Sequence, residues 1–580
     1  MVRRLAACLA TLCLLHSVTP AQERGPGFKM WATDALRKIR PKDPPPSASG
    51  MELRLSAARN EFEPFQVVLR SDGSDIDGVD VEVSDFAGPG ASVLHRGRVS
   101  LYFERYMNLK IPSSVEGEAG EWPDPLIPKI DSYHGEKRNA FPFRLARGRN
   151  QPLWIEIYVP PQTTPGTYKG SVIVTANGTA IGAVPVTIQV WRFALPSTSS
   201  LRTAFGFNGV TVLKQHQGHY TNDEDLSRLT FVYTEAALMH RISLIIGTLI
   251  PPPFTQSPKG IVIDWRNYDR EVGPFLDGTV FQGSHCLAGA RATSIDLRTH
   301  GSMDTDEKKV LYWKEWVRHF AGKGWLDRLF YYVWDEPKPE EIPKVARLAR
   351  LARRADPKLA TLVTTPRTKE LEGLIDIWTP LINCFESKPG LPDFCERVVP
   401  REVYEPELKQ GKKLWWYQSC GSHGCGGIGG EYFRGWPSYM IDVAASANRI
   451  MEWLSWTYGV QGELYFNTTE AYADSTDPLK SVYKFGGNGD GTLFYPGRPQ
   501  QIGGSTHIPI ESIRLKLIRE GLEDYEYLNL LSQMGLSSET RKKVNQMIQK
   551  TYHWDRAPKS LYAIREDLAR ELDSRFSKLE

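Results

Sequence analysis

From about Leu201 onward, short runs rich in β-branched and aromatic residues alternate with longer amphipathic stretches, and this alternation constrains the fold more than any other feature. The short runs are typical of strands, and strands that alternate with helices form parallel sheets. Eight strand candidates are present: Thr203–Phe207, Ser243–Gly247, Thr293–Leu297, Leu329–Trp334, Thr361–Thr364, Ile375–Thr379, Lys413–Tyr417 and Glu463–Phe466. Eight such units over residues 201–508 predict a (β/α)8, TIM-like barrel.

The helical runs between these strands have apolar residues at intervals of three and four, as amphipathic helices do. They cover Leu226–Met239, Lys308–Ala321, Glu340–Arg354 and Met440–Tyr458. A C-terminal helical region is expected over residues 509–580, and within it Glu511 to Leu531 should pack on the barrel.

Residues 51–196 follow a different period. Short runs such as Phe65–Arg70 and Ser171–Thr175 alternate apolar with polar residues between turns rich in glycine and proline. This pattern predicts an N-terminal β-sandwich. The segment Pro196–Ser200 serves as the linker, and the proline-rich residues 22–50 are expected to be an irregular lead-in.

The first 21 residues have the three regions of a secretory signal peptide, with Arg3 and Arg4, the apolar run Leu5–Leu15 and a cleavage site after Ala21. We therefore expect a secreted or periplasmic protein. No later stretch reaches about 18 apolar residues, so no membrane anchor is expected. Removing Arg3 and Arg4 lowers the formal charge from +3 to +1, which does not favour nucleic acid as a partner.

Five of the seven cysteines follow the signal segment, so they cannot all pair within the chain. Cys420 and Cys425 can close a loop disulfide, whereas a metal site needs more ligands than this segment supplies. The sequence also lacks the zinc-protease motif His-Glu-x-x-His, a Walker loop and a Gly-x-Ser-x-Gly elbow. No metal and no cofactor is expected.

Asp335 and Glu336 directly follow the strand candidate Leu329–Trp334, and Pro337 ends the pairing. Reacting groups of such barrels lie at the C-terminal ends of the strands. Cleavage of a glycosidic bond needs an acid for the leaving oxygen and a group that stabilises charge at the anomeric carbon. The pair is therefore the candidate catalytic centre, although Asp335 can instead cap the helix that follows.

Adjacent residues at a strand end diverge, which makes them unsuited to act as acid and nucleophile on one bond. A sugar with a 2-acetamido group removes this difficulty, because its carbonyl oxygen can attack the anomeric carbon itself. Asp335 would then orient the acetamido group and Glu336 would protonate the leaving group.

Six further residues are expected to bind substrate, either as aromatic surfaces for sugar or as hydrogen-bonding groups. Tyr417 is expected to bond the acetamido carbonyl, and Asn467 is a candidate for binding hydroxyl groups. The others are Trp416, Tyr465, Trp334 and Asn208; of these, Asn208 is a weaker candidate, as are Asp296 and Arg298. For Trp416 and its neighbour Trp415, filling the barrel wall is an equally good interpretation.

Five segments resemble glycoside hydrolase family 123, the retaining exo-β-N-acetylgalactosaminidases. They are AARNEFEPFQVVL at residues 57–69, WPDPL at 122–126, VWDEP at 333–337, GDGTLFYPG at 489–497 and IRLKLIREGLEDYEY at 513–527. The resemblance implies a sandwich followed by a barrel, no metal, and substrate-assisted cleavage with Asp335 orienting and Glu336 as general acid/base. A family tryptophan is expected where this chain has Phe466-Asn467.

Two other functions remain open at this stage. One is a glycosidase for another sugar, in which one carboxylate works with a distant partner such as Asp296 or Glu470. The other is a carbohydrate-binding protein without catalysis. All three interpretations have a glycan or glycoconjugate as partner.

Overall fold

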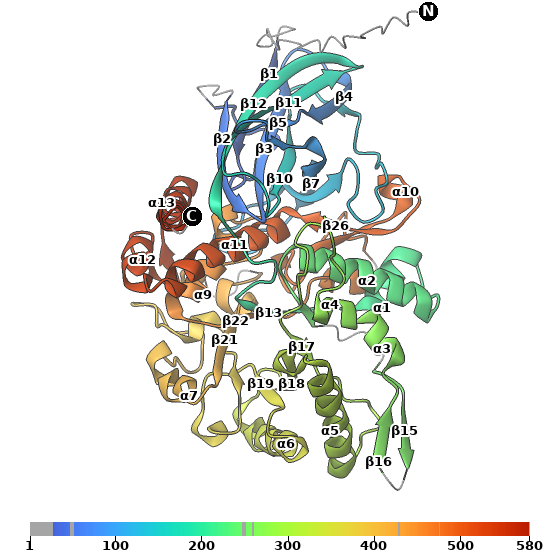
Figure 1. Ribbon diagram of the computed structural model, residues 1–580, viewed down its shortest axis with the longest axis vertical. Helices are drawn as coiled ribbons and strands as arrows, with labels where there is room; N and C mark the ends of the chain where they lie inside the picture. Colours follow the sequence, from blue (N-terminus) through green and yellow to red (C-terminus); the bar gives the residue numbers. More distant parts are fainter. Residues whose placement is uncertain are drawn as a thin grey trace, which may run out of the picture.

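The computed structural model describes residues 27–46, 52–245, 251–257, 260–426, 430–474 and 476–578. A strand-rich N-terminal part lies at one end of a larger part that contains a parallel sheet and helices (Figure 1). The expected signal segment, residues 1–21, lies outside the described residues.

The N-terminal part consists of two sheets that share one apolar core. The first has the order β1 (Phe28–Asp34), β3 (Glu61–Ser71), β10 (Asn150–Val159), β7 (Val99–Leu109), β8 (Gly120–Pro128), β26 (Ile508–Ser512) and β25 (Phe494–Gly497). The second has the order β2 (Leu53–Arg59), β12 (Thr179–Ala194), β11 (Gly166–Ala176), β4 (Ile76–Val83) and β9 (Phe143–Leu145). Phe65 and Val67 of β3 pack with Val172 of β11 and Ile188 of β12. The period-two pattern thus becomes two facing sheets.

Two parts of this sheet lie outside the expected range 51–196. The predicted irregular lead-in contains β1, which pairs with β3 because Phe28 and Trp31 can be buried at this edge. From the other end of the chain, β25 and β26 join β8, so the first sheet contains strands on both sides of the barrel sequence. The C-terminal helical segment accordingly begins at Ile513, after β26.

The larger part has a single parallel sheet in which all eight expected strands are confirmed. Their order is β14 (Leu244–Ile245), β13 (Arg202–Gly206), β22 (Gly462–Tyr465), β21 (Lys413–Tyr417), β20 (Ile377–Trp378), β19 (Ala360–Val363), β18 (Leu329–Trp334) and β17 (Ile295–Asp296). β14 and β17 complete the ring through side chains, because Thr293 N donates to Ser243 Oγ at 2.7 Å. The sheet is therefore a nearly closed barrel.

Helices surround this barrel, but not in a regular one-per-strand pattern. The main ones are α1 (Gly209–Gln217), α2 (Asp223–Met239), α5 (Asp306–Lys323), α6 (Ile342–Ala355), α9 (Met451–Tyr458), α11 (Ile513–Gln533) and α13 (Pro558–Phe576). Only the 3-10 turn η4 (Lys369–Leu371) connects β19 to β20. The (β/α)8 prediction is thus correct for the strands and too regular for the helices.

The helix expected over Met440–Tyr458 is wrong in its first half, since α9 begins at Met451. The Lys38 ammonium donates to the carbonyl oxygens of Met440, Ile441 and Val443, at 3.3, 2.8 and 3.0 Å. Three carbonyls that would accept helical hydrogen bonds are therefore held by a side chain from the N-terminal part. The sequence near Met440 contains no local pattern that predicts the contact with Lys38.

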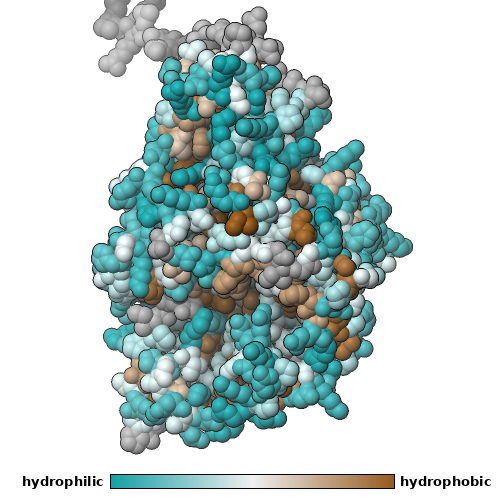
Figure 2. Space-filling model, turned by 180° about the vertical axis from the view of Figure 1, so that it is seen from behind, coloured by the Kyte–Doolittle hydropathy of each residue, from teal (hydrophilic) through white to brown (hydrophobic). Residues whose placement is uncertain are grey.

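The described part of the chain contains no helix with the length and apolar character needed to traverse a bilayer. The face seen in Figure 2 is mostly hydrophilic, with smaller apolar areas between.

The helix α11 is buried between the two parts (Figure 1) and carries seven buried charged side chains. Arg514 donates to Asp124 of β8, with the shortest contact at 2.8 Å, and Arg519 bonds Glu156 of β10 at 2.7 Å. On its other side Asp524 binds Arg449 at 2.7 Å. Because buried charges need partners, these ion pairs fix the position of the helix against both parts.

Replacing Arg514 by methionine (Arg514→Met) should destabilise the protein by about 3–5 kcal/mol, because the buried Asp124 carboxylate would keep the Tyr495 hydroxyl but lose its positively charged partner. Thermal unfolding would measure the effect. The matched control is Arg570→Met on the surface of α13, whose ion pair with Glu566 is 61% and 46% exposed and should matter by less than about 1 kcal/mol. Equal shifts in the two variants would contradict the proposed role of the buried pair.

Candidate active site

Asp335 and Glu336 lie at the C-terminal end of β18, and both are exposed. Glu336 has a φ of 43°, a left-handed conformation that costs a non-glycine residue about 1–2 kcal/mol. A hydrogen bond compensates for part of this cost, since Glu336 N donates to Thr364 Oγ1 at 2.7 Å. The turn ends the regular alternation of the strand. Asp335 does not cap a helix, because the next turn, η3 (Pro339–Glu341), begins after Lys338.

The Asp335 carboxylate is held through one of its two oxygens. Tyr332 Oη donates to Oδ1 at 2.7 Å, and Thr364 Oγ1 donates to the same oxygen at 3.0 Å. Within the described residues, Oδ2 has no protein hydrogen-bond partner. One edge of the carboxylate is thus fixed and the other can accept a hydrogen bond from a ligand.

Glu336 is held in the same way from the other side of the barrel interior. Tyr417, the last residue of β21, donates its hydroxyl proton to Glu336 Oε1 at 2.5 Å. Oε2 is without a hydrogen-bond partner in the part of the chain that the structure describes. Two adjacent carboxylates therefore each present one unbonded oxygen at the open end of the barrel.

Burial keeps the two tyrosines protonated. It raises the pKa of Tyr332 well above its usual value of 10.0, and the nearby Asp335 and Glu336 carboxylates raise it further. The pKa of Tyr417 is raised for the same reasons, burial first and then Glu336. The raised pKa values favour the protonated phenols, which can act as hydrogen-bond donors.

The sequence interpretation missed Tyr332 and Thr364. Tyr332 lies three residues before Asp335, on a strand in which Phe330 already faces the barrel interior. Thr364 follows β19, the neighbour of β18. The strand order was the available signal, because polar residues at the ends of neighbouring parallel strands lie together.

Trp416 and Tyr465, two of the expected substrate-binding residues, do not reach the carboxylates. Both are completely buried outside the barrel interior. Trp416 Nε1 donates to Ser455 Oγ of α9 at 2.9 Å, and Tyr465 Oη accepts from Gly491 N at 2.8 Å. The reason is the alternation of the strands, which turns Trp415 and Tyr417 inward and Trp416 outward.

The remaining candidates have structural contacts of their own. Asn208 caps α1, since its Oδ1 accepts from Thr211 N at 3.2 Å. Asn467 is half-buried, and both ends of its amide group are used, with Oδ1 accepting from Thr468 N at 2.8 Å and Nδ2 donating to Glu470 at 2.6 Å. Trp334 is half-buried with the Lys344 ammonium 4.2 Å from its ring centre.

Asp296, the weaker candidate, is buried and bound to Arg298 at 2.6 Å. Burial raises the pKa of its carboxyl, while Arg298 opposes that shift. Two small cavities lie elsewhere, in the apolar packing against α2 and between β8 and β26. They are not part of the carboxylate site.

Comparison with known proteins shows which family the chain matches and which solved structure has a similar fold. The description "Glycoside hydrolase 123 N-terminal domain" matches residues 32–176, and "Glycoside hydrolase 123, catalytic domain" matches residues 305–531. A solved family 123 glycoside hydrolase from Clostridium perfringens, described in relation to glycolipid glycan hydrolysis, is 14% identical with a TM-score of 0.67. The alignment covers 96% of this chain and 100% of that chain. This similarity concerns the fold.

Other solved structures are less similar and do not bear on the fold or the function of this chain. A family 39 glycoside hydrolase from Bacteroides cellulosilyticus WH2 aligns over 82% of both chains with 10% identity and a TM-score of 0.28. No curated protein matches the sequence.

Replacing Thr364 by valine (Thr364→Val) should destabilise the protein by about 1–3 kcal/mol, because the Glu336 N–H and Asp335 Oδ1 each lose a partner. Hydrogen exchange at the Glu336 amide should become faster. The matched control is Thr379→Val at the end of β20, whose buried hydroxyl has no hydrogen-bond partner among the described residues. Unchanged exchange at Glu336 in Thr364→Val would refute the assigned contact.

Proposed function

Because this chain belongs to glycoside hydrolase family 123, we propose that it is a retaining exo-β-N-acetylgalactosaminidase. Its membership of the family makes it a glycoside hydrolase that acts on a glycan substrate. Beyond family membership, we propose which sugar is cleaved, by which mechanism, and which residues carry out the reaction. The observation that carries it is the adjacent pair Asp335 and Glu336, each held by one oxygen and unbonded at the other.

In the first step, Asp335 Oδ2 accepts a hydrogen bond from the N–H of the 2-acetamido group and so orients that group. The acetamido carbonyl oxygen attacks the anomeric carbon, and the bond to the leaving oxygen breaks with both its electrons. Glu336 protonates that oxygen as it departs. The product is an oxazolinium ion, which keeps the N–H proton and is stabilised by the Asp335 carboxylate, with the anomeric configuration inverted so that the second step restores it.

In the second step, Glu336 acts as a base. It removes a proton from water while the water oxygen attacks the anomeric carbon, and the bond to the acetamido oxygen breaks. The sugar leaves with its original anomeric configuration, and Glu336 is protonated again. The carboxyl group therefore returns to its starting state after each cycle.

The contact of Tyr417 favours a role different from the one expected from the sequence. Its single hydroxyl proton is donated to Glu336 and is not available for the acetamido carbonyl. We assign Tyr417 the positioning of Glu336. Tyr332 and Thr364 position Asp335 in the same manner.

The alternative mechanism with a distant carboxylate has less support. Retaining enzymes that use an enzyme nucleophile place two carboxyl groups about 5 Å apart on either side of the scissile bond. Asp296, one candidate partner, is buried and ion-paired with Arg298. Glu470, the other, accepts a hydrogen bond from Asn467. A mechanism in which the acetamido group of the substrate is the nucleophile requires neither Asp296 nor Glu470.

Export is part of this proposal and rests on the N-terminal sequence. The pairs Cys384–Cys395 and Cys420–Cys425 form disulfides, and Cys286 is the free cysteine of the described residues. Disulfides persist in oxidising compartments, so this pairing is consistent with a secreted or periplasmic enzyme.

Asp335→Asn should reduce the hydrolysis of p-nitrophenyl β-N-acetylgalactosaminide at least about a hundredfold, because a transition-state contact is lost. Glu336→Gln should do the same, since it cannot protonate the leaving group. Parallel assays with the β-N-acetylglucosaminide and the β-galactoside identify the sugar. Comparable rates on the β-galactoside, which has no acetamido group, would exclude the substrate-assisted mechanism.

Tyr417→Phe should lower kcat about tenfold to a hundredfold and leave KM nearly unchanged, because Glu336 becomes charged only as it gives up its proton, and a hydrogen bond to a charged group contributes about 1.5–3 kcal/mol. The matched control is Tyr331→Phe on β18, whose ring packs on Trp313 of α5 with centroids 4.6 Å apart. This variant also removes a tyrosine hydroxyl, but one that lies on the outer face of β18. If both variants kept full activity, the positioning role of Tyr417 would be wrong.

A further inference from the structure

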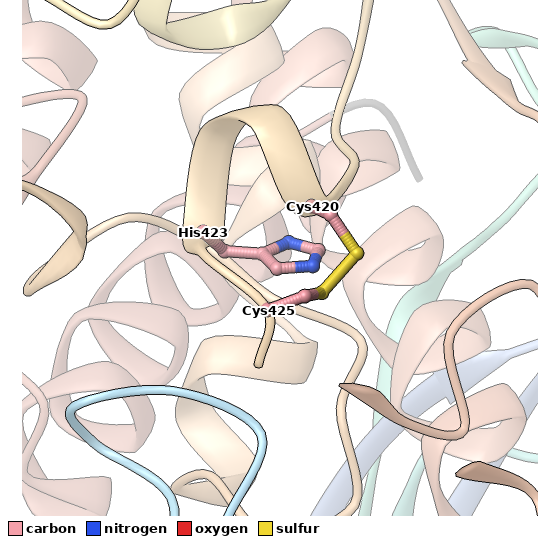
Figure 3. Close-up of side chains that lie close together, drawn as sticks. All are labelled: Cys420, His423 and Cys425. Atoms are coloured by element: carbon pink, nitrogen blue, oxygen red, sulfur yellow. A yellow bond between two sulfur atoms is a disulfide. The ribbon is translucent and has the colours of Figure 1, made fainter. Parts of the chain in front are cut away.

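A compact group of metal-binding residue types follows Tyr417 directly in the sequence. Cys420 and Cys425 form a disulfide with a sequence separation of 5, and His423 lies between them on the short helix α8 (Cys420–His423). Figure 3 shows the imidazole of His423 turned toward the two sulfur atoms. The ligand atoms of the three side chains lie within 4.8 Å of one another.

His423 is a buried polar side chain next to the disulfide. Neither of its ring nitrogens has a hydrogen-bond partner among the described residues. A buried polar group without a partner is costly, and an ion is one of the accepted explanations for such a group.

A fourth side chain of suitable chemistry comes from a distant part of the sequence. Asp490 is buried, and its Oδ2 lies 3.0 Å from Cys420 Sγ. Its other oxygen, Oδ1, has no hydrogen-bond partner in the described part of the chain. The segment 420–425 alone offers three ligands, and the fold adds the fourth.

We propose that Cys420, Cys425, His423 and Asp490 bind one zinc ion when the disulfide is reduced. Two thiolates, one imidazole and one carboxylate are a ligand set that zinc accepts in tetrahedral geometry. A dithiol reductant supplies two electrons and two protons to the disulfide and is itself oxidised to a disulfide. Zinc then displaces the two thiol protons as the metal–sulfur bonds form.

The disulfide and the metal are thus alternative ways of closing the same loop. The loop begins three residues after Tyr417, which holds Glu336. In an oxidising compartment the disulfide closes it, and under reducing conditions the metal does. The inference is independent of the proposed glycosidase activity, because it depends only on the residues of this loop and on Asp490.

The test uses the full chain after reduction with dithiothreitol and removal of the reductant under argon. Zinc chloride is added, unbound metal is removed by gel filtration, and bound zinc is measured by mass spectrometry. We expect one zinc per chain for the reduced wild type and none for the oxidised protein. Absence of stoichiometric zinc from the reduced wild type would overturn the proposal.

The second disulfide provides the matched control. Cys384→Ser/Cys395→Ser removes a pair with a sequence separation of 11 and should still bind one zinc, whereas Cys420→Ser/Cys425→Ser should bind none. Retention of zinc by the latter variant would refute the site. Asp490→Asn should weaken zinc binding at least about tenfold, because it removes the carboxylate ligand, and unchanged affinity would exclude Asp490 from the site.

A measurement on the wild type alone guards against variants that do not fold. Cobalt(II) replaces zinc in tetrahedral sites and gives a thiolate-to-metal absorption band when sulfur is bound. The reduced wild type should show this band with one equivalent of cobalt and lose it on addition of zinc. If the band does not appear, the cysteines do not bind metal and the proposal fails.

Discussion

The ion pairs of α11 are the interaction on which the rest of the structure depends. A helix between two domains normally buries apolar side chains, but this one also buries charges that only specific partners can neutralise. Arg514 and Arg519 find these partners on strands of the N-terminal sheet, and Asp524 finds Arg449 beside the barrel. Any displacement of one part against the other would separate these pairs at a cost of several kcal/mol each. The two parts therefore have one mutual arrangement.

That arrangement also controls the loops around the open end of the barrel. The GDGTLFYPG segment leaves the strand β22 region, passes Asp490 and Gly491, and continues into β25 of the N-terminal sheet. Gly491 N donates to Tyr465 Oη, and Arg514 donates to the carbonyl oxygen of Gly489 at 2.9 Å. The loop carrying Asp490 is therefore held from both parts, which explains how it meets Cys420. Lys38, from the N-terminal part, likewise donates hydrogen bonds to three backbone carbonyl oxygens that precede α9.

In the mechanism proposed above, a rigid scaffold holds an exposed carboxylate pair in position for the reaction. Asp335 and Glu336 lie in a turn, where they would be mobile on their own. The hydroxyl groups of Tyr332, Thr364 and Tyr417 restrict them, and burial raises the pKa of the two phenols, which favours their role as donors. The oxygens left without protein partners are the ones available to a substrate. Positioning of this kind lowers the entropy that must be lost during reaction.

The sequence by itself determined the eight barrel strands, the two-sheet character of the first domain and the position of the Asp335–Glu336 pair, because these depend on local period and on which residue ends a strand. It did not determine which wall residues face the site: Trp416 is compatible with substrate binding by sequence but faces outward, whereas Thr364 contacts both Asp335 and Glu336. It also did not indicate that strands near both ends of the chain belong to one sheet. Only the tertiary structure decided these features, since strand order, hydrogen-bond partners and the meeting of Cys420 with Asp490 depend on contacts between residues far apart in the chain.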